Sequence, residues 1–179
     1  MSTLTMELRA ADVDARTIDG IVAPYDAVSY LVPNPGGERI MRGAFAKSIR
    51  QRSARVPLFR HHDHSRAVGL SSAWDDGSSG LAASFAVRSG TVGDEILEEA
   101  RDGYLSGLSV GFKELIGSRG KDGVHEVREA QLVEVSLTAV PAYAEATVTA
   151  VRSASVEDIR AMFGPAPVVN LSPLPPLWR

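Results

Sequence analysis

Residues 107–112 read Gly-Leu-Ser-Val-Gly-Phe, and this stretch decides which kind of fold the chain adopts. The apolar side chains of Leu108, Val110 and Phe112 alternate with small residues, which is the two-residue period of a strand buried on one face. The next residues, KELIGSRGKDG, contain glycines too close together for a packed helix. Ser109 is therefore predicted to lie within a β-strand that a glycine-rich turn follows.

The same stretch contains the pattern G-x-S-x-G, which raises the question of whether Ser109 is a nucleophile. In the nucleophile elbow of α/β-hydrolases, a strand turns sharply at such a serine into a helix, and the histidine of the triad follows later in the chain. Here a strand continues past Ser109, and three of the four histidines precede it. If Ser109 is a nucleophile, it belongs to a different class of hydrolase.

Composition excludes several classes of protein. The 179 residues are 44% apolar, which suits one globular domain with a core. A formal charge of -3 and the lack of a long basic run argue against a nucleic-acid partner. Without cysteine, disulfides, thiolate zinc sites and a cysteine nucleophile are excluded. No apolar run approaches the roughly 20 residues that span a membrane, and no signal peptide is recognisable, so we expect no membrane association and a cytoplasmic location.

Alternating apolar and polar residues predict further strands along the chain. They cover residues 4–8, 17–23, 56–62, 81–87 and 133–137. A turn is expected at residues 74–77, between two antiparallel strands. Because strands dominate and do not alternate regularly with helices, we expect a strand-rich α+β domain, an antiparallel β-barrel surrounded by a few short helices.

Three short stretches have the pattern of helices: residues 43–52, 91–103 and 155–164. The second has the strongest signal, because Thr91 and Asp94 are placed as a capping box and Gly103 as a C-cap. Residues 165–179 are too rich in proline to be anything but an extended or disordered tail. The compact domain is expected to cover residues 1–164.

The cluster RHHDHSR, residues 60–66, is the densest set of catalytic residue types in the chain. In an extended segment His62 and His64 would project to the same face, and such a pair can ligate a metal. A third ligand would have to come from elsewhere, and beyond this cluster the chain has only His125, in an expected turn region. The metal hypothesis is therefore incomplete.

A second interpretation of the cluster makes one imidazole the general base for Ser109. Serine is a poor nucleophile until a positioned base takes its proton, and imidazole titrates near neutral pH. A carboxylate must then orient the imidazole, and Glu134, on the polar side of the apolar strand LVEVSL, is a candidate. Each residue also has a purely structural interpretation, as a loop histidine, a strand serine or a glutamate facing water, and spacing alone does not choose.

Four stretches of the chain carry distinctive motifs: ERIMRGAFAKSI (38–49), VPLFRHHDHSRAVG (56–69), DGYLSGLSVGF (102–112) and LVEVSLTAVPAYAEATV (132–148). In this order they contain a GAF helix, an apolar strand ending in His-Asp with a glycine soon after, a Leu-Ser-x-Gly-Phe strand, and a Glu-x-Ser-Leu strand followed by Pro-Ala. This order of motifs resembles that of the tailed-phage prohead proteases, the serine proteases of capsid maturation. The resemblance covers about residues 18–150 and implies that residues 1–164 form a prohead protease domain.

The resemblance implies that Ser109 is the nucleophile, His62 the base and Glu134 the residue that orients it, with no cofactor or metal. His61 stands where an asparagine is more usual in the family, which leaves His61 open as an alternative base. Ser106 and Ser136 are less favoured as nucleophiles, and Ser136 shares a strand face with Glu134 and lines the site.

The resemblance also implies a fold similar to the herpesvirus assembly protease. The implied substrates are scaffold protein or the scaffold-like N-terminal segment of the major capsid protein, and the protease itself, cleaved inside the immature capsid in the host bacterial cytoplasm. The sequence leaves open whether the protein forms a homo-oligomer. Two other hypotheses remain: a capsid-assembly module without catalytic activity, and a metal-assisted hydrolase built on His62 and His64.

Overall fold

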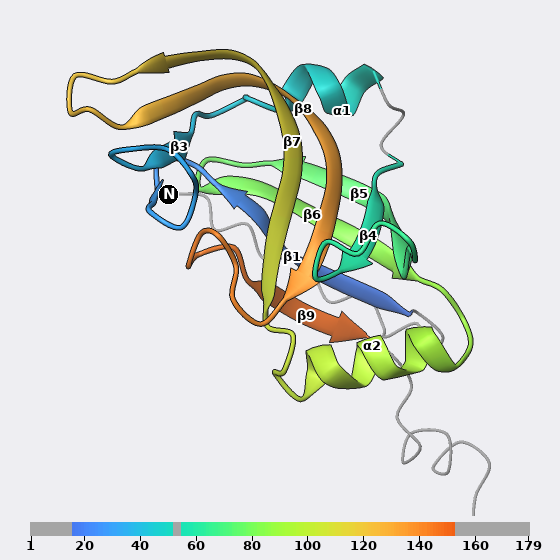
Figure 1. Cartoon of the computed structure of the whole chain (residues 1–179). Helices are drawn as coiled ribbons and strands as arrows, with labels where there is room; N and C mark the ends of the chain where they lie inside the picture. Colours follow the sequence, from blue (N-terminus) through green and yellow to red (C-terminus); the bar gives the residue numbers. More distant parts are fainter. Residues whose placement is uncertain (1–15, 52–54, 153–179) are drawn as a thin grey trace, which may run out of the picture.

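The computed structural model of the chain describes residues 16–51 and 55–152 (Figure 1). Its elements, in chain order, are β1 (Thr17–Pro24), β2 (Val28–Ser29), β3 (Glu38–Ile40), α1 (Ala46–Gln51), β4 (Pro57–Arg60), β5 (Gly69–Asp76), β6 (Gly80–Val87), α2 (Thr91–Arg101), β7 (Gly107–Arg119), β8 (His125–Thr138) and β9 (Val148–Arg152). The predicted strand at 4–8, the predicted helix at 155–164 and the tail at 165–179 lie outside the described residues.

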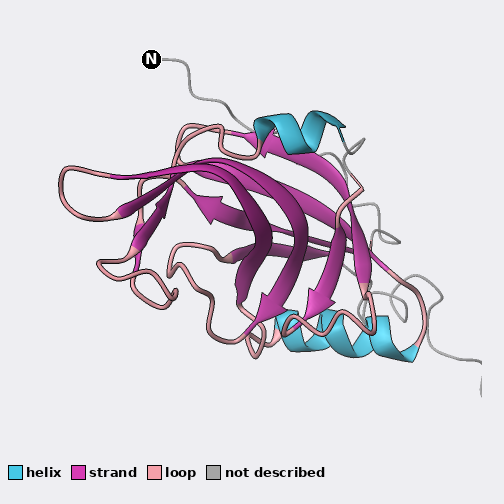
Figure 2. Ribbon diagram, turned by 45° about the horizontal axis from the view of Figure 1, so that its top comes forward, coloured by secondary structure: helices cyan, strands magenta, loops and turns pink. Residues whose placement is uncertain are grey.

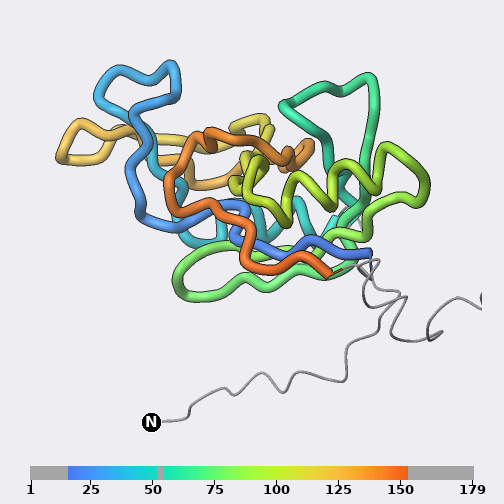
Figure 3. The backbone as a smooth tube through the Cα atoms, turned by 90° about the horizontal axis from the view of Figure 1, so that it is seen from below, coloured from blue at the N-terminus to red at the C-terminus, as the bar shows by residue number. Residues whose placement is uncertain are grey.

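The described strands form one curled sheet in which β8 is central. One edge of β8 pairs with β3 near its start and with β4 near its end, while β7 pairs along the other edge. From β4 the sheet continues through β5, β6 and β1 to β9, and Figure 3 shows β1 beside β9. Figure 2 shows the strands curling between α1 at one end and α2 at the other, which gives the strand-rich α+β fold that the sequence predicts.

The sheet is mixed, so the prediction of a wholly antiparallel sheet is wrong. Both β3 and β4 run parallel to β8. Parallel neighbours need a long crossover connection, and the chain between β4 and β8, which contains three strands and α2, supplies one. Backbone hydrogen bonds from the amide of Leu108 to the carbonyl of Ala146 and from the amide of Val148 to the carbonyl of Ser106 join the chain at the start of β7 to the chain at the start of β9. Closure of the sheet into a complete barrel stays a prediction.

Two local predictions around α2 need correction. Gly90, not Thr91, occupies the N-cap, and no side chain caps the helix, so the predicted capping box is wrong. Asp94 instead pairs with Arg16 at 2.7 Å, a contact between distant parts of the chain that local spacing cannot reveal. At the other end Asp102 is the C-cap, and Gly103 follows it with φ 83°, the left-handed conformation that ends many helices.

The turn predicted at residues 74–77 begins later, because β5 continues to Asp76. Trp74 packs edge-on against Phe85 of β6 with ring centroids 6.1 Å apart, and Asp76 accepts a hydrogen bond from the Tyr25 hydroxyl at 2.5 Å. Burial and this bond raise the pKa of Tyr25. These contacts hold the residues in the sheet, and Gly77 begins the turn.

The core lies inside the curl of the sheet and under both helices. Its largest fully buried apolar side chains are Phe45, Phe85, Ile18, Ile40, Leu58, Leu81, Ile96, Leu97, Leu108, Leu132 and Leu137. Burying one side chain of this size stabilises the fold by about 1.5–3 kcal/mol. The core therefore draws on almost every element and holds the long β7–β8 hairpin, which crosses in front of the other strands in Figure 1, in a defined position.

Candidate active site

The candidate site begins with the register of the β7–β8 hairpin. Ser109 lies directly opposite Ser136, and Gly111 lies opposite Glu134. Residues that face each other across an antiparallel pair project to the same side of the sheet. The pairing therefore gathers the predicted nucleophile, the predicted acid and Ser136 on one face of the hairpin.

This polar face is buried. The exposed fraction is 7% for Ser109, 1% for Glu134 and 0% for Ser136. A buried carboxylate is stable only when its oxygens have hydrogen-bond partners, because nothing else replaces the water it has lost. The interpretation of Glu134 as a residue that faces solvent is therefore wrong.

Both oxygens of Glu134 have partners. Oε1 lies 2.7 Å from Nδ1 of His62, and Oε2 accepts a hydrogen bond from the Ser136 hydroxyl at 2.7 Å. A carboxylate on Nδ1 selects the imidazole tautomer that leaves Nε2 free to accept a proton. The structure thus brings together two of the three predicted site residues in the arrangement that activates a general base.

His62 reaches Glu134 because the chain turns sharply after β4. The strand predicted to run to residue 62 ends at Arg60, and His61 and His62 have φ of 50° and 59°. Such left-handed conformations are uncommon for residues other than glycine and persist only where neighbouring groups hold them. The amide of His61 donates to the carbonyl of Leu137 at 2.9 Å, and the amide of His62 donates to the Ser136 hydroxyl at 3.1 Å.

The two adjacent histidines lead to different places. His61 lines a hollow beside α2 together with acidic side chains of that helix, among them Glu95 and Glu98. His62 contacts Glu134, although 46% of its own side chain stays exposed. The structure therefore favours His62 over His61 as the base.

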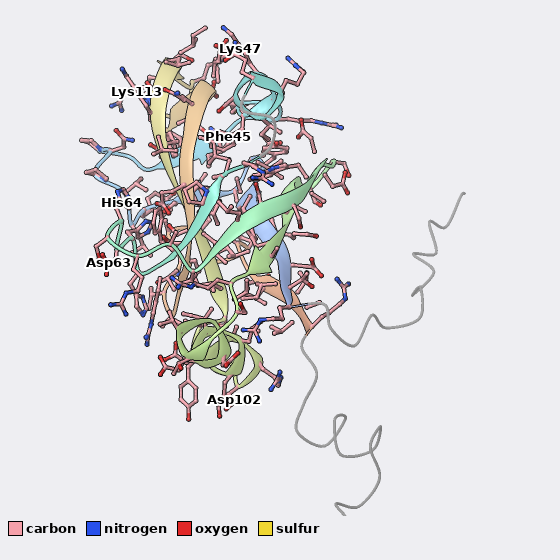
Figure 4. The ribbon with its side chains drawn as sticks, turned by 90° about the vertical axis from the view of Figure 1, so that its right-hand side faces the viewer. Phe45, Lys47, Asp63, His64, Asp102 and Lys113 are labelled. Carbon is pink, nitrogen blue, oxygen red and sulfur yellow. The ribbon has the colours of Figure 1, made fainter. Side chains whose placement is uncertain are left out.

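The segment after His62 does not support the metal hypothesis. His62 and His64 do not share the face of a strand; the ring of His64 packs against Phe59 with centroids 5.0 Å apart. Ser65 donates to Asp63 through both its hydroxyl and its amide, and these bonds lower the pKa of Asp63. Figure 4 shows Asp63 and His64 on this outer loop. Within residues 16–51 and 55–152, no cluster of three or more metal-binding side chains occurs.

Ser109 lies on the same face of the hairpin as Glu134 and Ser136 because of its position on β7. It lies opposite Ser136, whose hydroxyl contacts both Glu134 and the amide of His62. Among the hydrogen bonds of the described residues, none joins Ser109 to His62. Such nucleophile–base contacts are often long before substrate binds and tighten in the complex.

The position of Gly111, the second glycine of the G-x-S-x-G pattern, explains why a glycine stands there. A Cβ at this position would overlap the carboxylate of Glu134, so only glycine leaves room for the acid. The structure places both glycines within β7, which confirms the prediction that Ser109 lies on a strand and not at an elbow. The two-residue period could have located Gly111 on the face of Ser109, but not its closeness to Glu134.

Comparison with known proteins adds the family. Residues 4–161 match the sequence profile of the caudovirus prohead serine proteases, which confirms the resemblance and extends it beyond residues 18–150. The chain belongs to this family. It is therefore a serine protease of capsid maturation. No curated protein matches the protease chain.

Two solved structures of viral proteases are similar to this chain over 68% and 81% of its length. The bacteriophage T4 capsid assembly protease is similar over 68% of this chain and 80% of its own, with 16% identity and a TM-score of 0.47. The varicella-zoster virus protease is similar over 81% of this chain and 69% of its own, with 17% identity and a TM-score of 0.47. In the described part of the protease, no helix is long and apolar enough to cross a membrane.

Proposed function

We propose that Ser109 is the nucleophile of this protease, His62 its general base and Glu134 the residue that orients His62. The observation that carries the proposal is the 2.7 Å contact between Nδ1 of His62 and the buried carboxylate of Glu134, beside the strand that holds Ser109. A buried serine, an imidazole and a carboxylate in this order form the set that acyl transfer needs.

The proposed reaction proceeds in two halves. Nε2 of His62 takes the proton of the Ser109 hydroxyl while Oγ attacks the carbonyl carbon of the scissile peptide bond. The imidazolium returns the proton to the leaving amine as the C–N bond breaks, and an acyl-enzyme remains on Ser109. Water then attacks the ester with its proton passing to His62, and Ser109 leaves with that proton.

Glu134 acts on the charge that forms during each half. When His62 is protonated, the carboxylate lies next to the new positive charge in a buried setting, where the attraction is stronger than in water. It also holds Nδ1 as the donor, so that Nε2 stays the accepting atom. The proton stays on His62, and Glu134 remains ionised throughout.

The proposed substrates follow from membership of the family. They are a scaffold protein or the scaffold-like N-terminal segment of the major capsid protein, and the chain itself, cleaved inside the immature capsid in the host bacterial cell. Capsid and scaffold proteins are then its partners, and a homo-oligomer is compatible with this setting.

The test compares intact masses of the full-length wild type and Ser109→Ala, incubated side by side, alone and with the capsid protein of the same particle. The proposal predicts that the wild type shortens itself or the capsid protein at defined sites and that the variant shortens neither. Cleavage by Ser109→Ala at the rate of the wild type would contradict the assignment of the nucleophile. If the wild type, the variant and the capsid protein all stay intact, alone and in the mixture, the result would instead support an assembly module without catalytic activity.

A further inference from the structure

We propose that Ser136 is a positioning residue of this protease: its hydroxyl holds the carboxylate of Glu134 and the backbone of His62 in one fixed relation. The inference rests on the proposed function, because it concerns how His62 and Glu134 are aligned. Ser136 touches neither the substrate nor the reacting atoms and acts through these two residues.

The first contact fixes the acid. Ser136 donates from Oγ to Oε2 of Glu134 at 2.7 Å, while Oε1 of the same carboxylate contacts Nδ1 of His62 at 2.7 Å. A carboxylate bound through one oxygen can rotate about its terminal torsion, which has a broad energy minimum. Binding of the second oxygen by Ser136 restricts that rotation and aims Oε1 at the imidazole.

The second contact fixes the base from its backbone. The amide of His62 donates to the same Ser136 hydroxyl at 3.1 Å. His61 and His62 are both left-handed, and two such residues in succession are strained unless their surroundings hold them. The position of the imidazole thus depends on a turn that Ser136 helps to hold closed.

One hydroxyl makes both contacts because a serine side chain has one donor and two acceptor positions. The hydroxyl donates a hydrogen bond to the carboxylate of Glu134, and one of its lone pairs accepts a hydrogen bond from the amide of His62. Ser136 is completely buried, so water cannot readily replace the hydroxyl if it is removed. Loss of this single group would release the acid and the base at once.

The experiment measures how a fluorophosphonate probe modifies Ser109 in the full-length protein. The serine oxygen bonds to phosphorus, fluoride leaves, and the hydroxyl proton passes to His62, so the reaction depends on the base. Labelling rates over a range of probe concentrations separate the maximal rate, kinact, from the half-saturating concentration, KI.

For Ser136→Ala we expect kinact to fall about 10- to 100-fold, because misplacement of a reacting group by about 1 Å costs about 100-fold. KI should be unchanged, since Ser136 does not touch the probe. Ser136→Thr keeps the hydroxyl and should restore kinact to within a few-fold of the wild type. If Ser136→Ala does not fold, Ser136→Cys tests the same point, because a thiol has nearly the same size but is only a weak donor.

Ser48→Ala is the matched control. Ser48 is also a buried serine, and its hydroxyl accepts a hydrogen bond from the amide of Leu132 on β8 at 2.9 Å. The Ser136 hydroxyl accepts a hydrogen bond from the amide of His62 in the same way. Its loss should lower the melting temperature and leave kinact unchanged. A role for Ser136 in stability alone would make the two variants behave alike.

Each outcome is decisive. Equal kinact at Ser109 in the wild type and Ser136→Ala, or in the wild type and a folded Ser136→Cys, overturns the positioning role and leaves the proposed function intact. A proportional fall of kinact in Ser48→Ala also overturns it. Failure of the wild type to label at Ser109 overturns the proposed function itself, and the role of Ser136 with it.

Discussion

Near Ser109 both faces of the β7–β8 hairpin are buried, but they are held in different ways. On one face Leu108 and Leu137 lie opposite each other at 0% exposure, and their side chains belong to the apolar core. On the other face Glu134 and Ser136 are 1% and 0% exposed, and each has specific hydrogen-bond partners. Burial therefore does not distinguish the candidate site from the core; the partners of the buried atoms do.

The comparison predicts that substitutions on the two faces fail differently. Apolar packing is spread over many weak contacts, so loss of one side chain weakens the fold without changing the chemistry. The polar face depends on a few directed bonds, so loss of one group disables the site while the core stays intact. The following substitutions test this difference, from the largest expected effect on activity to the smallest.

His62→Ala should remove the general base and lower the rate of capsid-protein cleavage by up to about 10^6-fold, because members of a catalytic triad act as a unit. His61→Ala is the matched control, since His61 lines the hollow beside α2 instead of contacting Glu134. It should keep activity within about tenfold of the wild type, measured as the initial rate of cleavage. The reverse ranking of the two variants would make His61 the base.

Glu134→Gln keeps the shape of the side chain but removes the charge that stabilises the imidazolium of His62. We expect the cleavage rate to fall about 10^3- to 10^4-fold, with the melting temperature changed far less than the rate. The hairpin supplies a control, because Glu114 forms a second glutamate–histidine pair with Nε2 of His125 at 2.5 Å. That pair is partly exposed, so Glu114→Gln should leave the rate unchanged. Equal losses in both variants would contradict a special role for Glu134.

Gly111→Ala should lower the cleavage rate about 10- to 100-fold, because the added methyl group displaces the carboxylate of Glu134. The crowding should also cost about 1–3 kcal/mol in the free energy of unfolding, measured with urea. At Gly77 an added Cβ would meet only the carbonyl oxygen of Gly80, at 3.5 Å. Gly77→Ala should therefore keep full activity. If Gly111→Ala is as active as Gly77→Ala, the added methyl group does not displace the carboxylate of Glu134, and the prediction is wrong.

Leu108→Ala tests the apolar face beside the nucleophile. It should lower the free energy of unfolding by about 2–5 kcal/mol, because a fully buried leucine leaves a cavity. Activity per folded molecule should change less than about tenfold, since the side chain points away from Glu134 and Ser136. A loss of activity that exceeds the loss of folded protein would mean that the two faces are not independent.

Much of the fold could be predicted from local patterns in the sequence. The two-residue alternation placed Ser109 within a strand and found the strands at residues 17–23 and 81–87, because each is buried on alternate sides. The parallel pairing of β8 with β3 and β4 could not be found in this way. Strand direction within a sheet depends on the path of the chain through space, and no local pattern records it.

The candidate site was predictable in its members more than in its geometry. Ser109, His62 and Glu134 follow from the family motifs, and alternation puts Ser136 on the face of Glu134. The left-handed turn at His61 and His62 was not predictable, since it depends on contacts with Leu137 and Ser136 across the sheet. The capping box at Thr91 failed for a related reason, because Asp94 pairs with an arginine far away in the sequence.

The most direct test of the proposed nucleophile is to identify which residue of the wild-type protein a fluorophosphonate modifies. After saturating labelling, proteolytic digestion and peptide mass mapping would locate the adduct. A nucleophile at Ser109 that depends on His62 predicts a single adduct on Ser109, and none when His62→Ala is treated in the same way. An adduct on Ser106 or Ser136, or labelling of Ser109 that is as fast without His62, would contradict a nucleophile on the polar face of β7 activated by His62 and Glu134.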